Sequence, residues 1–310
     1  MKIKTVFFTL IFIFLLFFYP YMSQASPICS CGEERILKVQ EPYITGKDVR
    51  EVQIRLKDLG YYSGPINGIY DKTTAKAVMD FQIAENLSVD GMVGRKTLQK
   101  MAELYEKPVV ISPTEKPSGE VAIVIYALDR QLIVMSDGKP YKSFPVAVGT
   151  FETPTPIGVF EITEKSAWGE GFGSRWMRLS VPWGVYGIHG TNKPWTIGGY
   201  ESHGCIRMLN KHVEQVYDWV NVGTKVYIIG GVDGPFTFGM RTLTQGSKGS
   251  DVVEIQKRLA GLGYYDGEID GRYGWGTRES VIKFQKNNKL DPSGNVDKET
   301  YKALGIELFE

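Results

Sequence analysis

The sequence predicts a multidomain α+β protein in which a mostly β domain lies between two small three-helix domains. The first reason is an internal repeat: residues 48–62, DVREVQIRLKDLGYY, return with few changes at residues 251–265 as DVVEIQKRLAGLGYY. The second is the chain between the two copies, where short β-branched and aromatic runs alternate with Asp-Gly, Thr-Pro and Gly signals, as in strands joined by turns. A chain of 310 residues has room for two or three domains.

The N-terminus has the pattern of a secretory signal peptide. Lys2 and Lys4 precede an apolar run over residues 6–18, and the small-residue sequence SQA follows at residues 23–25. A basic segment, an apolar segment and a cleavage motif in this order predict a signal peptide over residues 1–25. The apolar run is shorter than the ~20 residues that a membrane span needs. We therefore expect an exported protein with no membrane contact beyond this signal; an uncleaved anchor is the alternative.

Composition and charge narrow the class of protein. Hydrophobic residues make up 43% of the chain and charged residues 23%, the balance of an ordinary globular protein. The net charge is +1, so no nucleic acid or other polyanion is expected as a partner. Three cysteines are too few for a disulfide framework, and export would leave Cys205 as an unbridged thiol in an oxidising compartment. Cys29 and Cys31 lie in a short N-terminal segment, and the sequence assigns them no role.

Each copy of the repeat, over residues 46–105 and 246–306, predicts a unit of three helices. Positions correspond at an offset of 203 without a gap, as far as Met101 and Leu304. The first helix has apolar residues at 3-4-3 spacing, a glycine-rich turn leads to a second helix with a Phe-Gln pair, and a last turn leads to a short third helix. The residues behind this prediction are Val49, Val52, Leu56, Leu59, Phe81, Gln82, Gly91 and Thr97, with their counterparts Val252, Ile255, Leu259, Leu262, Phe284, Gln285, Gly294 and Thr300.

The glycine-rich turn of the second copy invites a calcium interpretation, which the spacing excludes. Asp266, Glu268 and Asp270 precede Gly271 as in an EF-hand loop, but the twelfth position is Thr277 instead of Glu. The acids are better explained as turn formers. With their LGYY sequence, glycine turns and Phe-Gln pair, both copies resemble the peptidoglycan-binding repeat of exported wall enzymes. The resemblance implies peptidoglycan as a partner; a helical spacer without a ligand is the alternative.

The middle of the chain predicts the β domain. Residues 106–120 form a linker that contains Pro and Ser, and a second linker covers roughly residues 231–246. The strand-like runs are VAIVIY, QLIVM, YKSFPVAVG, GVFEIT, MRLSV, GVYGIHG and TKVYIIGG, and MSDGKPY predicts a hairpin turn. One helix is expected to begin near Asn210, with an apolar face made by Val213, Val216, Tyr217 and Val220.

The sequence ESHGCIRM, residues 201–208, is the strongest chemical signal. Cys205 follows a glycine-rich loop and precedes the predicted helix, whose N-terminal amides would favour a thiolate. Gly204 would let the amides of residues 203–205 approach a reacting carbonyl and form an oxyanion hole. A histidine within hydrogen-bond reach would complete a nucleophilic pair, and His189 and His203 are the candidates. His212 falls inside the helix and is expected to be a solvated residue.

Two alternatives compete with a nucleophilic Cys205. His189, His203 and Cys205 together could supply three zinc ligands, although no C-x-x-C or H-E-x-x-H motif accompanies them. A buried structural cysteine is the other alternative.

A second resemblance favours the nucleophile. IHGT at residues 188–191, SHGCIRM at residues 202–208 and GTFETPTPIGVFEIT at residues 149–163 resemble the L,D-transpeptidase catalytic domain. The resemblance covers residues 119–230 and implies a β-sandwich-like catalytic domain that needs no metal or cofactor. It implies Cys205 as nucleophile and His189 as general base. Ser202, His203 and Gly204 would shape the loop and the oxyanion hole, and Gly190, Thr191 and Arg207 would contact substrate. The alternative for Arg207 is an ion pair with a nearby acid. Many members have Asn where this chain has Arg207, so acceptor recognition can differ.

The resemblance implies acyl transfer on peptidoglycan stem peptides. An L,D-transpeptidase would pass the acyl group from a Cys205 thioester to an amine of another stem, with the repeats held on the glycan. An L,D-carboxypeptidase, which passes the acyl group to water, is one alternative, and a non-catalytic wall-binding protein is the other. The intact His189 and Cys205 pair argues against the last. The expected location is extracellular or in the cell wall, or in the periplasm where the envelope has an outer membrane.

Overall fold

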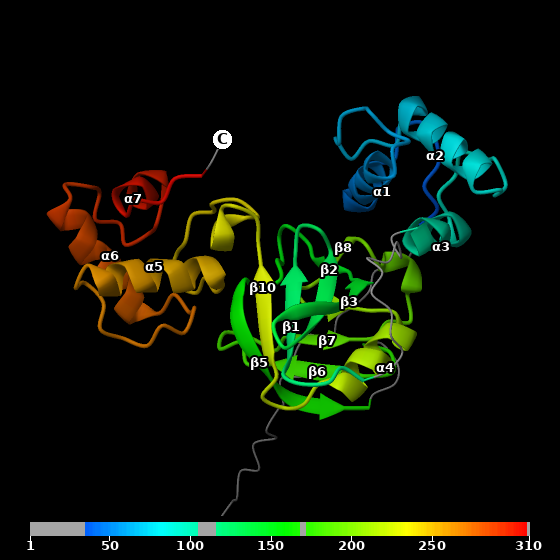
Figure 1. Ribbon diagram of the computed structural model, residues 1–310. Helices are drawn as coiled ribbons and strands as arrows, with labels where there is room; N and C mark the ends of the chain where they lie inside the picture. The colour runs from blue at the N-terminus through cyan, green and yellow to red at the C-terminus, as the bar shows by residue number, and fades with distance from the viewer. Residues whose placement is uncertain (1–34, 105–115, 168–171, 309–310) are drawn as a thin grey trace, which may run out of the picture. The chain divides into compact units, whose positions relative to one another are not determined.

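The computed structural model describes residues 35–104, 116–167 and 172–308, which belong to one compact unit (Figure 1). Helices α1 to α3 precede a mostly β domain, and helices α5 to α7 follow it. The predicted architecture of a β domain between two three-helix units is thereby confirmed. The predicted signal peptide, Cys29 and Cys31 lie outside the described residues. None of the helices within the described ranges is long and apolar enough to cross a membrane.

The two repeats have matching helices. Repeat 1 consists of α1 (Lys47–Asp58), α2 (Lys72–Ala84) and α3 (Arg95–Leu104), and repeat 2 of α5 (Ser250–Gly261), α6 (Trp275–Asn287) and α7 (Lys298–Ala303). The apolar positions of the first helix are buried as expected, because the 3-4-3 spacing gathers them on one face. The last position differs in both repeats, because it caps the end of the helix: Leu59 is only partly buried, and Leu262 is exposed.

Buried glutamines hold the turns of both repeats. In repeat 1 the Oε1 atom of Gln53 accepts a hydrogen bond from the amide of Gly68 at 2.9 Å, and its Nε2 donates to Thr74 at 3.1 Å. In repeat 2 Gln256 bonds to Gly271 and Thr277 in the same way, and its Nε2 also donates to Asp270. Asp270 thus satisfies a side-chain amide within the turn, which agrees with its role as a turn former.

The core of each repeat includes residues that precede its predicted boundary. In repeat 2, Phe236 and Leu243 are buried in the core, and the ring of Phe236 lies 5.6 Å from that of Tyr301. Both residues fall in the expected second linker. In repeat 1, Leu37 and Ile44 take part in the corresponding core. Three short helices bury little apolar surface, so a flanking segment is needed to complete each core.

The β domain is built on a curled eight-stranded sheet. Its strands run in the order β3-β2-β1-β10-β5-β6-β7-β9. Strands β1 and β10 are parallel, as are β7 and β9, and the other neighbours are antiparallel. The bounds are Val121–Tyr126 for β1, Gln131–Ser136 for β2, Lys139–Pro145 for β3, Gly158–Ser166 for β5, Trp176–Leu179 for β6, Gly187–His189 for β7, Ile206–Arg207 for β9 and Lys225–Ile229 for β10.

Local sequence explains the regular part of this domain. The predicted hairpin joins β2 to β3 through Asp137 and Gly138, whose φ angles of 48° and 73° are those of a tight hairpin turn. Helix α4 (Asn210–Trp219) follows β9 and packs beside β7, with Val213 and Val216 buried in the domain core. The predicted strands and helix are present.

A second, two-stranded sheet was not predicted. It pairs β4 (Val148–Gly149) with β8 (Tyr200–Ser202) in parallel. Strands this short have no period-2 pattern to recognise, and they form only because segments far apart in the chain meet. Strand β8 leads directly into the ESHGCIRM sequence, so this small sheet positions the start of the candidate site.

Candidate active site

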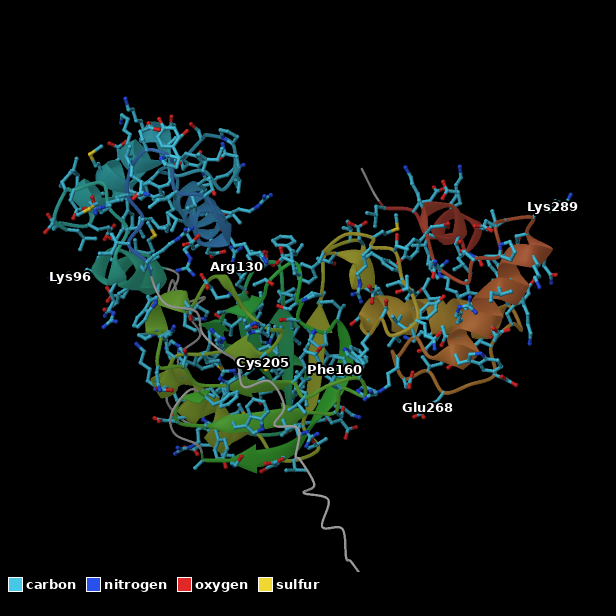
Figure 2. The ribbon with its side chains drawn as sticks, turned by 180° about the vertical axis from the view of Figure 1, so that it is seen from behind. Lys96, Arg130, Phe160, Cys205, Glu268 and Lys289 are labelled. Atoms are coloured by element: carbon cyan, nitrogen blue, oxygen red, sulfur yellow. The ribbon has the colours of Figure 1, made fainter. Side chains whose placement is uncertain are left out.

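Strand pairing brings the chain around Cys205 next to His189. Strands β7 and β9 are parallel, with Ile188 opposite Ile206 and His189 opposite Arg207. Cys205 directly precedes β9, so its backbone adjoins the β7–β9 pair. Cys205 is buried, with 6% of its surface exposed, among the side chains of the β domain (Figure 2).

A backbone carbonyl sets the tautomer of His189. The Nδ1 atom lies 2.6 Å from the carbonyl oxygen of Gly190. A carbonyl can only accept, so Nδ1 carries the proton and Nε2 presents a lone pair. Nε2 is buried and has no hydrogen-bond partner within the described part of the chain. His189 therefore offers one unprotonated nitrogen, which is what a general base requires.

The surroundings of His189 keep it neutral. Its ring lies 5.0 Å from the ring of Phe172 and 5.6 Å from that of Trp176, and the residue is 1% exposed. Burial lowers the pKa of His189 to about 4; the nearby charge of Arg207 lowers this pKa further, while the hydrogen bond to Gly190 opposes the shift. The imidazole is thus ready to accept a proton at neutral pH.

Ser202 shapes the loop that presents Cys205. Its Oγ accepts a hydrogen bond from the amide of Gly204 at 3.0 Å and donates to the carbonyl of Cys205 at 2.5 Å. The side chain is buried, so these bonds are shielded from water. Because the amide of Gly204 is engaged within the loop, it is not positioned to serve as one of the three predicted oxyanion donors.

Tyr186 packs against this loop and was missed by the sequence analysis. Gly204 has a φ of 105°, and a Cβ there would lie 2.6 Å from Cε1 of Tyr186. Burial, and next the nearby Cys205, raise the pKa of Tyr186, which keeps its hydroxyl neutral. The only sequence signal was its place three residues before His189 in GVYGIHG.

The other two histidines take different positions. His203 is exposed at the bend of the loop, while His189 is buried in β7. His212 lies in α4, but it is half-buried with its ring 5.1 Å from the ring of Phe144, so the expectation of a solvated residue was wrong. Its position in the helix was predicted, but the contact with β3 depends on tertiary packing.

The expected contribution of a helix terminus differs from the structure. Helix α4 begins at Asn210, and Cys205 is separated from it by strand β9, so the backbone of Cys205 is not part of the first turn. The side chain of Asn210 instead accepts a hydrogen bond from the amide of Ser174. A Cβ on Gly190 would lie 2.1 Å from this Asn210 oxygen, which explains the glycine after His189.

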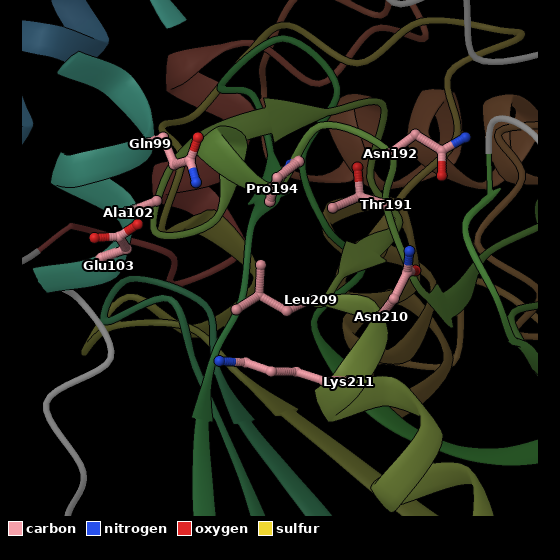
Figure 3. Close-up of a pocket in the computed structure, with 9 residues that line it drawn as sticks. All are labelled: Gln99, Ala102, Glu103, Thr191, Asn192, Pro194, Leu209, Asn210 and Lys211. Carbon is pink, nitrogen blue, oxygen red and sulfur yellow. The ribbon is translucent and has the colours of Figure 1, made fainter. Parts of the chain in front are cut away.

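The predicted substrate-contact residues lie near His189 in the chain or in the strand register. Arg207 is 5% exposed and neighbours His189 across the β7–β9 pair. Thr191 is also buried, and its Oγ1 accepts a hydrogen bond from the amide of Lys193. Thr191 also borders a pocket of about 660 Å³, whose lining includes neither Cys205 nor His189 (Figure 3). The lining consists of Gln99, Ala102, Glu103, Thr191, Asn192, Pro194, Leu209, Asn210 and Lys211.

The zinc alternative has no assembled ligand set. Across the described ranges, no three His, Cys, Asp or Glu side chains gather in a way that could hold a metal ion. His189, His203 and Cys205 therefore do not form such a group, and exposure of His203 separates it from the other two.

Comparison with known proteins identifies the family. Residues 120–228 match the L,D-transpeptidase catalytic domain family, and residues 45–101 and 248–304 each match a peptidoglycan-binding domain family. The Bacillus subtilis protein YqjB, which is named as an L,D-transpeptidase, is 30% identical over 126 residues, or 36% of this chain and 72% of YqjB. The chain belongs to the L,D-transpeptidase family.

Two further proteins of this family are similar. YkuD of Bacillus subtilis is 42% identical over 100 residues, which cover 32% of this chain and 60% of YkuD. The chain thus spans less than two thirds of that relative. The crystal structure of an L,D-transpeptidase fragment from Xylanimonas cellulosilytica covers 59% of this chain and 94% of its own, with 26% identity and a TM-score of 0.31. Membership of the L,D-transpeptidase family and two peptidoglycan-binding domains indicate a protein associated with the cell wall.

The lowered pKa of His189 predicts a stability that depends on pH. The folded pKa of about 4 lies below the ordinary value of 6.5, so between these values the unfolded chain binds a proton that the folded chain excludes. The contribution of His189 to stability should be constant above pH 6.5 and fall as the pH drops towards 4, by up to about 3 kcal/mol. His189→Asn keeps a donor for Gly190 but cannot titrate. In urea unfolding at several pH values it should lose this dependence, while His203→Asn should retain it.

The contact of Gly204 with Tyr186 predicts a specific loss of thiol reactivity. Gly223 is a matched control, because its φ of 91° is equally strained for alanine but a Cβ added there would have no atom within 4 Å. Gly204→Ala should slow alkylation of Cys205 by iodoacetamide by about tenfold or change its pH profile, because the loop must shift. Gly223→Ala should lower the melting temperature without changing the alkylation rate. Equal alkylation rates in both variants would contradict this account of the loop.

Proposed function

We propose that this chain is an exported transpeptidase that cross-links peptidoglycan through a thioester on Cys205. The observation that carries the proposal is the state of His189. Its Nδ1 is committed to the carbonyl of Gly190, and its Nε2 is buried and without a partner in the described chain. The strand that carries it, β7, pairs with β9, which Cys205 directly precedes. A neutral imidazole beside a thiol is the arrangement that activates cysteine for acyl transfer.

In the first half-reaction, Nε2 of His189 removes the proton from the Cys205 thiol. The thiolate attacks the carbonyl carbon of an L-centre residue that is followed by a D-residue in the stem peptide. The amides of His203 and Cys205 stabilise the oxyanion, and Ser202 keeps their loop in place. The carbon–nitrogen bond then breaks, and the imidazolium gives its proton to the departing amine of the D-residue. A thioester remains on Cys205.

In the second half-reaction, an amine from another stem attacks the thioester. His189 takes a proton from this amine and returns it to the sulfur as the carbon–sulfur bond breaks, so the enzyme is regenerated and an amide cross-link has formed. Arg207 offers a buried guanidinium for a stem carboxylate. Gly190 and Thr191, which follow His189 in the chain, contact the substrate next to the base. The two repeats hold the enzyme on the glycan and raise the local concentration of stems.

Substitution of the two histidines tests the assignment of the base. Cys205 should form one covalent adduct with a carbapenem, seen by intact mass and absent in Cys205→Ser. His189→Ala should slow this acylation by about 10²- to 10⁴-fold, the usual contribution of general acid–base catalysis. His203→Ala should have a smaller effect, because that side chain is exposed. Stopped-flow acylation rates of both variants measure the difference. A slower His203→Ala than His189→Ala would reverse the assignment.

The products distinguish transfer from hydrolysis. Purified protein incubated with a disaccharide-tetrapeptide should yield cross-linked dimers, detected by mass spectrometry. Shortened monomers without dimers would show that water resolves the thioester and would identify an L,D-carboxypeptidase. Absence of both products, together with an unreactive Cys205, would leave a wall-binding protein.

A further inference from the structure

The two repeats use the same ion pair in different ways. Glu51 and Arg55 of α1 correspond to Glu254 and Arg258 of α5, and in each pair Nε donates to Oε1 at 2.8 Å. The side chains of Arg55 and Glu51 are 1% and 7% exposed, whereas those of Arg258 and Glu254 are 39% and 24% exposed. The two residue types, their spacing and the Nε–Oε1 distance are therefore the same, whereas the surroundings differ.

The remaining guanidinium donors explain the difference. In repeat 2, Nη1 of Arg258 donates to the carbonyls of Leu304 and Gly305, both at 3.0 Å, and so closes its own repeat. In repeat 1, Nη1 of Arg55 donates to the carbonyl of Trp195 at 2.7 Å and Nη2 to that of Thr196 at 3.1 Å. These two carbonyls belong to the catalytic domain, 140 and 141 residues further along the chain.

Residues 195–200 of the catalytic domain leave room for the Glu51–Arg55 pair and bond to it. The amide of Tyr200 donates to Oε2 of Glu51 at 3.3 Å. A Cβ on Gly199 would lie 2.1 Å from Nη2 of Arg55 and 2.7 Å from Oε1 of Glu51, so only a glycine admits the pair. Arg95 of α3 adds a second contact, with its guanidinium 4.9 Å from the centre of the Trp195 ring.

The contacted segment connects the two reactive side chains. Residues 190–202 begin after His189 and end at Ser202, whose Oγ holds Gly204 and Cys205. Within it, the carbonyl of Gly199 accepts a hydrogen bond from Val148, and β8 pairs with β4. A displacement of residues 195–200 is thus transmitted through β8 to the loop that presents Cys205.

We propose that Arg55 and Glu51 of repeat 1 are positioning residues for the active site. They hold the segment between His189 and Ser202 in the geometry that acylation needs, so repeat 1 is a structural part of the catalytic centre, and repeat 2 has no such role through its own pair. The inference rests on the proposed role of Cys205 as nucleophile. A planar guanidinium suits this task because it can bond a carboxylate and two carbonyls at once.

Arg55→Ala and Gly199→Ala test the contact from its two sides, with Arg258→Ala as the matched control. Acylation of Cys205 by a carbapenem is followed over a range of concentrations, which separates the rate at saturation from the half-saturating concentration. Arg55→Ala and Gly199→Ala should each lower the rate at saturation by about tenfold or more, because a small misplacement of reacting groups is costly. The half-saturating concentration should change less, and Arg258→Ala should stay within about twofold of wild type in both quantities.

The double variant adds a readout that general destabilisation would not produce. The methyl of Gly199→Ala meets Arg55, so in the Arg55→Ala background the second substitution should cost little more. Circular dichroism checks that each variant is folded. If Arg55→Ala does not fold, Gly199→Ala alone decides, because it leaves the Glu51–Arg55 pair in place. The inference is overturned if Gly199→Ala, and Arg55→Ala where it folds, are acylated at the same saturating rate as the wild-type protein. Failure of wild type to be acylated rejects the proposed function itself.

Discussion

The parallel pairing of β7 with β9 is the constraint on which the active site depends. Antiparallel neighbours can be joined by a two-residue turn, but parallel neighbours need a crossover of a dozen or more residues. Here the crossover is residues 190–205, and it carries Thr191, β8 and the whole Ser202–Cys205 loop. His189, the proposed base, therefore stands at the start of a long irregular connection, and Cys205, the proposed nucleophile, stands at its end. The relative position of His189 and Cys205 therefore depends on how firmly residues 190–205 are held. This dependence explains why so many other residues contact that segment.

Burial gives the site its chemistry and also limits its stability. The rings of Phe172 and Trp176 pack around His189, and its burial lowers its pKa and leaves the imidazole neutral at neutral pH. The same exclusion leaves Nε2 without a partner in the described chain, and a buried polar atom without a partner lowers stability. Such a cost is expected where a group must remain available for reaction. The hydrogen bond from Nδ1 to Gly190 offsets part of it and selects the tautomer.

The two repeats illustrate how one sequence pattern can serve two purposes. Their glutamine-centred turns and apolar faces are equivalent, because each unit must complete its own small core. Their Glu–Arg ion pairs are not equivalent. An exposed Glu–Arg pair such as Glu254–Arg258 contributes little to stability, whereas a buried one must satisfy every donor it takes out of water. Arg55 meets that requirement with backbone carbonyls of the catalytic domain.

The sequence by itself determined the features that depend on local pattern. Periodicity, turn chemistry and short motifs predict the helices of both repeats, the strands of the main sheet other than β9, the Asp137-Gly138 hairpin, and Cys205 and His189 as the reactive candidates. These signals are local because neighbouring residues in one helix, strand or loop share them. Tertiary structure alone decided the rest. The β4–β8 pair, the packing of Tyr186 on Gly204 and the divergence of Arg55 from Arg258 each join residues far apart in the chain. No pattern within a repeat distinguishes Arg55 from Arg258, because the difference lies in what each side chain meets after folding.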